Sequence, residues 1–280
     1  FVDIGDEKEA FIHYLDLGLY FEAFDEFVKR LNPNTDAKGI YKHIKPDHIL
    51  EKEGRIENVL TPGQMIIVQI VKEPISTKGS RLTAEISLAG RNIVLLPFAE
   101  KVSVSQKISS KEEKRRLETL VRNILPKNYG AIIRTAAEGK NAAVLDAEVI
   151  SLVEKWENSW KKLAQSKGVQ LLFTEYSKTT TILRDLLNDS FSNIYVNNEN
   201  IYEEIRKYIS LISPEQEKIV KLYKDKAPIF DHFEVTRQIK SSFGKVVPIK
   251  QGAYLVIEHT EALHVIDVNS GIRTKNKEQE

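Results

Sequence analysis

The 280-residue sequence contains no cysteine, and it has only one methionine and two tryptophans. The lack of cysteine excludes disulfides, thiolate zinc sites and cysteine nucleophiles within this stretch, and it is in keeping with a cytoplasmic location. No apolar run approaches the roughly 18 residues that a membrane-spanning helix needs, so we expect a soluble protein without a membrane span. The chain also lacks an initiator methionine and a visible signal peptide. It opens on a strand-like run, Phe1–Gly5, and we therefore expect the natural N-terminus to be missing.

The chain has no excess of charge of either sign, with 41 Lys and Arg against 40 Asp and Glu. The net charge therefore does not indicate a polyanionic partner, and local clusters must be considered instead. Between Thr236 and Lys250 there is no acid, one aromatic residue (Phe243) and four cations: Arg237, Lys240, Lys245 and Lys250. This pattern suits a surface that follows phosphates, and it suits a solvated basic face equally well.

What is present is typical of a globular protein. Hydrophobic residues make up 41% and charged residues 29% of the chain. A chain of this length exceeds what one hydrophobic core usually supports, so we expect more than one domain. There is no internal repeat. A glycine-rich nucleotide loop, an HExxH motif and a Gly-x-Ser-x-Gly elbow are all missing, which leaves a metabolic enzyme without support from the sequence.

The first 88 residues have the pattern of short β-strands separated by proline and glycine. The strand-like runs are Phe1–Gly5, Ala10–Tyr14, Met65–Val71 and Arg81–Leu88. This spacing predicts a small barrel or sandwich. The insertion Leu17–Leu60 is expected to be a decorated loop or a short helix. Its phenylalanines at helical spacing indicate core residues in preference to a binding surface: Phe21, Phe24 and Phe27.

The middle of the chain alternates between strand and helix patterns. We expect strands at Ile93–Pro97 and Ala131–Arg134, and helices at Lys111–Ile124 and Asn141–Gln165 with apolar residues at the 3.6-residue period. Two tryptophans lie in the apolar stripe of the longer helix. Packing explains Trp156 and Trp160 better than base stacking does.

Further amphipathic helices are expected in the last third of the chain, at Thr180–Leu187, Ile201–Ile212 and Pro214–Tyr223. Two strands joined by a short turn follow, at Tyr254–Glu258 and Leu263–Asn269. The final residues, Thr274–Glu280, are polar and are expected to fray. These patterns together predict a multi-domain α+β protein.

Phe1 and Phe11 are ten residues apart, which places two aromatic side chains on neighbouring strands. Aromatics on such a face stack on unpaired bases, at about 1 to 3 kcal/mol per base. On the residues alone, barrel core is the better explanation of both. Their spacing, with the turn at Lys78-Gly79 and the strand that follows, resembles an S1-type RNA-binding OB fold. That resemblance implies that Phe1 and Phe11 form a stacking platform and that Lys78 contacts phosphate.

Four motifs occur in order along the chain: Ile-Ser-Leu-Ala-Gly at 86–90, Ile-Ile-Arg-Thr-Ala at 132–136, Gly-Lys at 139–140 and Thr-Glu-Ala-Leu-His-Val-Ile-Asp-Val-Asn-Ser at 260–270. Together they resemble the catalytic half of the ribonuclease E/G family. The similarity extends over essentially the whole chain, and the last motif is quite specific. A lone Arg-Thr or a lone Asp-x-Asn would signify little.

The resemblance implies a particular order of domains. Residues 1–88 would form an S1-like OB-fold barrel that binds RNA, and residues 89–178 a 5′-sensor α/β subdomain. Residues 179–242 would form an RNase H-like subdomain. Residues 243–280 would begin a DNase I-like catalytic subdomain.

The resemblance also implies an activity. Family members are expected to cleave single-stranded, often A/U-rich RNA endonucleolytically with Mg²⁺, leaving 5′-phosphate products, in RNA processing and mRNA decay. They favour substrates with a 5′ monophosphate. A homo-oligomer is implied as well, with zinc at a subunit-linking cysteine motif whose ligands are absent from this chain.

In the sensor, Arg134 and Thr135 match the family's phosphate-gripping pair, and Gly90 and Val94 match positions whose backbone surrounds the same pocket. A guanidinium grips phosphate through two parallel bonds, a hydroxyl adds a third donor, and glycine permits close approach of the backbone. Where the family's best-known form has a further arginine, this chain has Gln106 followed by Lys107. Lys107 would act there as a point charge. On general grounds Arg134 is open to another explanation, a surface ion pair.

Asp267 and Asn269 are two residues apart on a predicted strand, so both side chains project from one face, about 7 Å apart along it. By the resemblance they are catalytic residues, and Asp267 is a Mg²⁺ ligand whose orientation the Asn269 amide assists. The family's second metal-binding Asp follows some tens of residues later, beyond Glu280. We therefore expect the 280-residue chain itself to be inactive. Without the resemblance, a capping or turn-facing Asp267 is the better interpretation, and a non-catalytic RNA-binding module is the rival function.

Overall fold

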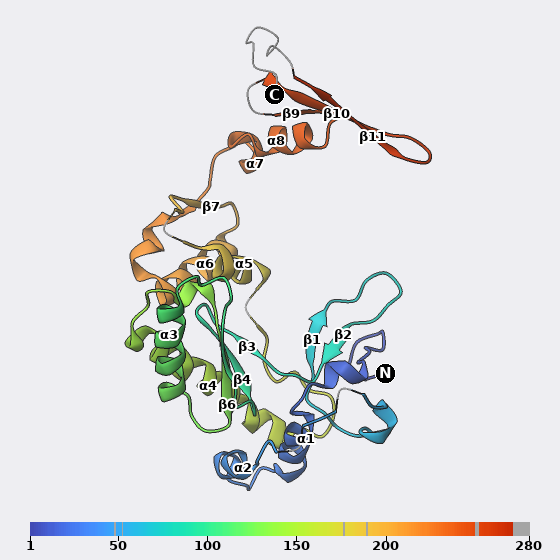
Figure 1. Cartoon of the computed structure of the whole chain (residues 1–280), viewed down its shortest axis with the longest axis vertical. Coiled ribbons are helices and arrows are strands. Elements are labelled where there is room, and N and C mark those ends of the chain that lie inside the picture. Colours follow the sequence, from blue (N-terminus) through green and yellow to red (C-terminus); the bar gives the residue numbers. More distant parts are fainter. Residues whose placement is uncertain (48, 52, 176, 189, 250–251, 271–280) are drawn as a thin grey trace. The chain divides into compact units, whose positions relative to one another are not determined.

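The computed structural model describes residues 1–47, 49–51, 53–175, 177–188, 190–249 and 252–270 (Figure 1). Two compact units, Phe1–Leu187 and Asn188–Glu280, make up the chain. Both units mix helices with strands, which confirms the expected multi-domain α+β class. Lys250 and the polar end Thr274–Glu280 lie outside the described residues.

The centre of the first unit is a four-stranded sheet of order β3-β4-β6-β5. Its strands are β3 (Leu88–Ala89), β4 (Ile93–Pro97), β5 (Val102–Val104) and β6 (Tyr129–Ile133). β4 pairs antiparallel with β3 and with β6, and β5 pairs parallel with β6. β4 has the predicted bounds and β6 starts two residues before the predicted strand. β5 was not predicted, because three residues are too few to establish a period.

The two faces of this sheet differ in burial. Ile93 lies opposite Ile133 and Leu95 lies opposite Ala131, and all four side chains are fully buried. On the other face Val94 lies opposite Ile132, which is 42% exposed. Because side chains alternate along a strand, one face of the sheet is packed and the other is open.

Two helices cover the packed face. These are α3 (Lys111–Ile124) and α4 (Ala142–Gln165), whose first turns are capped by the side chains of Ser110 and Asn141. Both helices match their predictions. The two tryptophans of α4 are buried in the same apolar cluster as the sheet, as predicted. Serine and asparagine at the N-cap satisfy backbone N–H groups that the helix leaves unpaired, which explains the agreement at this end.

The insertion contains more helix than was predicted: α1 (Phe21–Arg30), α2 (Ala37–His43) and η2 (Ile56–Asn58). A 3₁₀ helix, η1 (Tyr14–Leu17), leads into it. The three phenylalanines of α1 are buried, which confirms their prediction as core. Phe24 and Phe27 pack edge-on against Phe98, and Tyr41 of α2 stacks on Trp160 at 5.0 Å between ring centroids. The insertion therefore completes the core of the first unit.

The N-terminal strands are shorter than predicted. Regular pairing in the described residues of 1–88 outside the central sheet joins β1 (Gln69–Lys72) to β2 (Arg81–Thr83), and the runs Phe1–Gly5 and Ala10–Tyr14 form only single bridges. Gly5 has a positive φ, and Tyr14 begins the 3₁₀ helix η1, so both runs end early. The predicted strand Arg81–Leu88 is divided into β2 and β3, and between them the side chain of Gln69 bonds the Ser87 backbone.

The last helix of the first unit, α5 (Lys178–Leu186), is capped by Ser177 and agrees with the prediction within two residues. In the second unit, β7 (Ile194–Val196), α6 (Glu199–Ile212) and β8 (Val220–Leu222) form a parallel β-α-β arrangement. The predicted helix Pro214–Tyr223 is wrong. A 3₁₀ segment, η4 (Pro214–Ile219), leads into β8, where Val220 is buried and Lys221 exposed in the alternation of a strand.

The remainder of the second unit has two short helices and an antiparallel sheet. The helices are α7 (Ile229–His232) and α8 (Val235–Ser242), and the sheet has the order β11-β10-β9. Its strands are β9 (Val246–Pro248), β10 (Tyr254–His259) and β11 (His264–Asn269), of which the last two were predicted. Within the described ranges, none of the helices is at once long and apolar enough to cross a bilayer.

A buried asparagine joins the insertion to the central sheet, and it provides a test of this packing. Asn128 has a positive φ of 65°, and its amide donates to the carbonyl oxygens of Tyr41 at 2.7 Å and Ile44 at 2.8 Å. We expect Asn128→Ala to lower the free energy of unfolding by about 2 to 4 kcal/mol, because two buried acceptors lose their donor and alanine disfavours this φ. Asn128→Gly should cost about 1 kcal/mol less, since glycine accepts the conformation.

Urea unfolding followed by tryptophan fluorescence measures both changes, because both tryptophans belong to the first unit. The exposed Asn123→Ala on α3 is the control and should leave the midpoint nearly unchanged. Equal midpoints for wild type and Asn128→Ala would contradict this role of the amide.

Candidate nucleic-acid interface

A half-buried carboxylate holds the turn between β3 and β4. Glu148 of α4 accepts hydrogen bonds from the backbone N–H groups of Arg91 and Asn92, the latter at 3.1 Å to each carboxylate oxygen. Burial raises the pKa of Glu148, while these backbone bonds act in the opposite direction. Gly90 allows this approach, since a Cβ there would overlap the Glu148 carboxylate and lie 2.8 Å from the Ile93 carbonyl oxygen. No pattern in the sequence indicated Glu148.

Arg134 follows β6 directly and lies beside this turn. Its backbone N–H donates to the Asn92 carbonyl oxygen at 2.8 Å, so the sheet itself fixes the position of the main chain. The guanidinium Nη1 donates to the carbonyl oxygen of Gly90 at 3.0 Å. The structure therefore brings two of the predicted sensor residues into direct contact.

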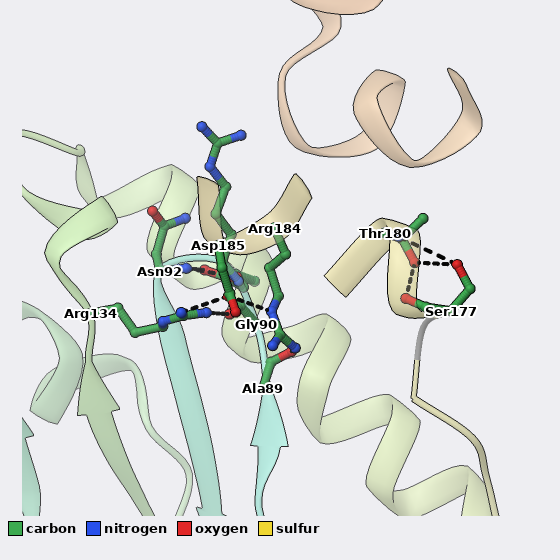
Figure 2. Close-up of polar contacts among 10 residues, drawn as sticks. Ala89, Gly90, Asn92, Arg134, Ser177, Thr180, Arg184 and Asp185 are labelled. Atoms are coloured by element: carbon green, nitrogen blue, oxygen red, sulfur yellow. Dashed lines mark hydrogen bonds and ion pairs between the residues drawn. The ribbon is translucent and has the colours of Figure 1, made fainter. Parts of the chain in front are cut away.

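The guanidinium of Arg134 also has an acidic partner that the sequence did not indicate. Nη2 of Arg134 lies 2.7 Å from Oδ1 of Asp185 on α5. Arg184 donates from Nε to the same Oδ1 at 3.0 Å and from Nη1 to the Ala89 carbonyl oxygen at 3.1 Å. Figure 2 shows the two arginine side chains reaching the Gly90 turn from opposite sides. Arg134 is thus in an ion pair, the alternative that the sequence left open.

Burial alone would raise the pKa of Asp185, but the hydrogen bonds from Arg184 and Arg134 outweigh it and lower the pKa below its ordinary value. The carboxylate is therefore ionised at neutral pH. Two guanidinium groups and one carboxylate leave this cluster with a net positive charge, which suits an anionic ligand.

The remaining predicted sensor residues lie around the same end of the sheet. Thr135 is exposed and begins η3 (Thr135–Ala137), immediately after Arg134. Val94 is half-buried on the open face of β4. Lys107 is exposed in the loop after β5, two residues beyond Ser105, whose N–H donates to the Ile133 carbonyl oxygen at 2.8 Å.

The three residues predicted to bind RNA lie on adjacent backbone segments. Val2 bridges to Ala10, and Phe11 bridges to Arg81, so the segments that carry Phe1 and Phe11 run beside the β1–β2 hairpin. Lys78 is exposed in the loop of that hairpin, where it pairs with Ile75. Phe1 is 92% exposed and Phe11 is 37% exposed. Neither phenylalanine is core, so the alternative that the residues alone favoured is wrong.

Two further features of this region were not indicated by the sequence. Gly79 lies so close to the Glu9 carbonyl oxygen that a Cβ would overlap it, which explains glycine after Lys78. Lys8 donates from its ammonium group to the Ser76 carbonyl oxygen. A second cation therefore lies beside the loop that carries Lys78.

Asp267 and Asn269 both lie on β11, with side chains on the same face. The amide Nδ2 of Asn269 donates to Oδ2 of Asp267 at 2.9 Å. Asp267 is exposed and Asn269 is half-buried. No group of three or more His, Cys, Asp or Glu side chains that could hold a metal ion occurs among the residues for which coordinates are described.

Two other surfaces are less suited to a polyanion. A depression beside η2 is lined by Arg55 and by four carboxylates that would repel phosphate, those of Glu22, Asp47, Glu51 and Glu53. In the basic stretch, Phe243 is 88% exposed, but Lys245 lies 3.3 Å from Glu258 and Arg237 lies 3.9 Å from Glu234. Acids outside the stretch thus offset part of its charge.

The family that the sequence resembles is also the one that comparison with known proteins finds. Residues 87–280 match the model of the Ribonuclease E/G family. The chain belongs to this family.

Particular relatives agree over nearly the whole chain. It is 34% identical to ribonuclease G of Haemophilus influenzae over 271 residues, which cover 97% of this chain and 51% of that protein. It is 32% identical to ribonuclease G of Escherichia coli K12, covering 97% and 52%. It is 31% identical to ribonuclease E of a Nostoc species, covering 99% and 37%. The chain spans about half the length of the ribonuclease G relatives that it matches.

The exposure of the two phenylalanines yields a prediction. Replacing Phe1 or Phe11 by Ala should weaken binding of single-stranded RNA about 10-fold at constant salt, because each loses an aromatic face for stacking. Fluorescence anisotropy with a labelled oligoribonucleotide measures the dissociation constant. Leu15, which is 63% exposed, provides the matched control, since Leu15→Ala removes apolar area without removing an aromatic ring.

The unfolding midpoints should be the same in all three variants, because none of these side chains is buried. Unchanged affinity in both phenylalanine variants would show that bases stack elsewhere, and an equal loss in Leu15→Ala would show that aromaticity is irrelevant.

Proposed function

We propose that this protein acts in a Mg²⁺-dependent endoribonuclease that cleaves single-stranded RNA in RNA processing and mRNA decay, leaves 5′-phosphate products and favours 5′-monophosphorylated substrates. Its relatives carry the names ribonuclease G and ribonuclease E. The observation that carries the proposal is the contact of Arg134 with the Gly90 turn at one end of the central sheet. The cytoplasm, where transcripts are processed, is the proposed location.

The chemistry of Arg134 and Thr135 at this end of the sheet supports recognition of a terminal phosphate. A guanidinium presents parallel N–H groups that match two phosphate oxygens, and the adjacent Thr135 hydroxyl adds a donor. The backbone of Arg134 is held by the sheet and its Nη1 by Gly90, so little orientation has to be gained on binding. A 5′ hydroxyl offers no charge to pair with, and a triphosphate is bulkier.

Lys107 would supply the further positive charge at this end of the sheet. Its ammonium is a point charge on a flexible stem and lacks the planar fork of an arginine. We therefore propose that this chain prefers 5′ monophosphate less strongly than a relative with arginine at the corresponding position.

The RNA chain itself would be held by the N-terminal region, with Phe1 and Phe11 as stacking surfaces and Lys78 as a phosphate contact. Adjacent segments carry the three residues, and all three side chains are exposed. Non-specific stacking tolerates any base, which suits a nuclease that acts on many transcripts.

Asp267 and Asn269 are the proposed catalytic residues. The Asn269 amide fixes the Asp267 carboxylate through the 2.9 Å bond, and carboxylate oxygen is the donor that Mg²⁺ prefers. The donor set fits Mg²⁺, which keeps several waters and takes only one or two carboxylates from the protein. When bound, the ion would polarise the scissile phosphate and lower the pKa of a bound water.

The domain order given by the resemblance is part of the proposal: an S1-like OB fold at 1–88, the 5′ sensor at 89–178, an RNase H-like subdomain at 179–242 and the start of a DNase I-like subdomain at 243–280. The four-stranded sheet with its two helices supports the sensor, and the parallel β7-α6-β8 arrangement supports an α/β subdomain after it. Association of several copies is also proposed.

A non-catalytic RNA-binding module is the second candidate. One observation favours it for the 280-residue chain: among the described residues, Asp267 does not belong to any group of three or more His, Cys, Asp or Glu side chains that could hold a metal ion. With a single carboxylate Mg²⁺ would be held weakly and would be poorly oriented. We therefore propose that the 280-residue chain binds RNA and does not cleave it.

The sensor is tested by a ratio of affinities. Arg134→Ala should abolish the preference for 5′-monophosphorylated over 5′-hydroxyl RNA and should leave binding to circular RNA nearly intact, because only the contact with the terminal phosphate is lost. Dissociation constants for the three RNAs at one salt concentration are the measurement. The control is Arg122→Ala on α3, which removes the same charge from an ion pair with Glu118. An equal loss of affinity for all three RNAs would make Arg134 a general backbone contact.

The metal site is tested by cleavage. In a version of the chain that continues as far as its ribonuclease G relatives do, Asp267→Asn should remove Mg²⁺-dependent cleavage by about 100-fold or more and spare RNA affinity, because the ion loses a charged ligand. Asn269→Ala should be less severe, since orientation is lost and charge is retained. Gel analysis of end-labelled RNA measures the rates.

Two outcomes would contradict this assignment. One is full activity of the longer protein after Asp267→Asn. The other is Mg²⁺-dependent cleavage by the 280-residue chain after purification free of contaminating nucleases.

A further inference from the structure

The ion pair between Arg134 and Asp185 joins the proposed phosphate site to a helix that no sequence motif connected with it. The carboxylate Oδ1 lies 2.7 Å from Nη2 of Arg134, where a phosphate oxygen would be bound. A guanidinium can bind two oxygens at once either through Nε and Nη2 or through Nη1 and Nη2, so Nη2 takes part in both arrangements. The carboxylate therefore occupies the nitrogen that either way of binding phosphate would use.

Arg134 does not need Asp185 for its orientation. Its backbone N–H is bonded to the Asn92 carbonyl oxygen, and its Nη1 donates to the Gly90 carbonyl oxygen at 3.0 Å. Both partners come from the β3–β4 turn, which Glu148 holds from the opposite side. A positioning role for Asp185 is therefore redundant.

Asp185 has a second partner that would remain after Arg134 is released. Nε of Arg184 donates to the same Oδ1 at 3.0 Å, and Nη1 of Arg184 is anchored to the Ala89 carbonyl oxygen. The Arg184 side chain is only 8% exposed, whereas that of Asp185 is 39% exposed. The carboxylate can therefore leave Arg134 and still be paired with Arg184. Phosphate can take its place on Arg134 without leaving an unpaired buried charge.

The local charge supports the same conclusion. Arg134, Arg184 and Asp185 together carry a net charge of one positive unit, whereas a 5′ monophosphate carries up to two negative charges at neutral pH. A carboxylate on the same guanidinium would repel the incoming phosphate across a few ångströms of partly buried space. Removing the carboxylate charge raises the cluster to two positive units.

We propose that Asp185 is a specificity-determining residue that occupies Arg134 in the absence of RNA and that a 5′ phosphate must displace. The carboxylate sets how strongly the protein prefers 5′-monophosphorylated RNA, and α5 is the element that carries this competitor. The inference rests on the proposed role of Arg134 as a phosphate sensor.

The test compares dissociation constants for 5′-monophosphorylated and 5′-hydroxyl forms of one short single-stranded RNA at constant salt. Asp185→Asn keeps the shape of the side chain and removes its charge. It should raise the preference for the monophosphate about threefold to fivefold, the range expected when a partly exposed ion pair no longer competes. In the background of Arg134→Ala the same change should have no effect on the ratio, because the competitor and the phosphate share that one group.

Glu118→Gln is the matched control. Glu118 is 40% exposed and pairs with Arg122 at 2.8 Å, so this variant also removes one half-exposed carboxylate from an arginine in the same unit. Its ratio should equal that of wild type. A rise in Glu118→Gln equal to that in Asp185→Asn would show a general effect of net charge and would overturn the inference.

The outcomes separate the inference from the function on which it rests. If Arg134→Ala keeps the wild-type preference, the sensor itself is wrong, and the inference fails with it. If Arg134→Ala abolishes the preference but Asp185→Asn leaves it unchanged or lowers it, only the inference is overturned. Asp185→Ser is the second variant, with unfolding followed by tryptophan fluorescence. Loss of the native transition in both Asp185 variants would also overturn the inference, because an exchangeable carboxylate cannot be essential to the fold.

Discussion

The half-buried carboxylate of Glu148 is the constraint on which the candidate phosphate site depends. It fixes the backbone N–H groups of Arg91 and Asn92 and thereby the carbonyl oxygens that the turn presents on its other side. Those carbonyl oxygens receive the N–H of Arg134 and the two guanidinium groups. An apolar residue in place of Glu148 would leave buried backbone donors unpaired and the turn without a defined shape. A glycine at position 90 is a consequence of the same carboxylate, which fills the space of a Cβ.

The rest of the first unit keeps this turn rigid. One face of the sheet is packed against α3 and α4, and the aromatic side chains of the insertion close the end of the same core. The proposed phosphate contacts, Arg134, Thr135 and Lys107, lie at one end of this sheet, where they follow strands or precede a helix. A site on loops that a packed sheet positions can recognise phosphate with little loss of side-chain entropy. Asp185 brings a carboxylate from the neighbouring helix α5 to the same site.

Much of this arrangement could be predicted from the sequence, because long periodic segments and capping residues fix local structure. Lys111–Ile124 was recovered from its apolar spacing, and the four motifs identified the family that comparison then showed. Short strands could not be predicted, since β5 and β7 each have three residues and no readable period. Glu148, Arg184 and Asp185 could not be predicted because their partners lie between 51 and 95 residues away in the chain. The helix predicted at Pro214–Tyr223 was wrong. Proline at its first position favours a helix, but the residues after Ile219 alternate as in a strand.

The central claim is that the Gly90 turn and Arg134 bind the 5′ phosphate of single-stranded RNA. Nuclear magnetic resonance tests it most directly, by titrating the isotopically labelled protein with a short RNA in its 5′-monophosphate and 5′-hydroxyl forms. The account predicts that the Arg134 Nε–H signal and the amide signals of Arg91 and Asn92 shift with the monophosphate and stay in place with the hydroxyl. Signals around Phe11 and Lys78 should shift with both RNAs. Identical shifts of Arg134 with both forms, or no shift at this turn with either, would contradict the account.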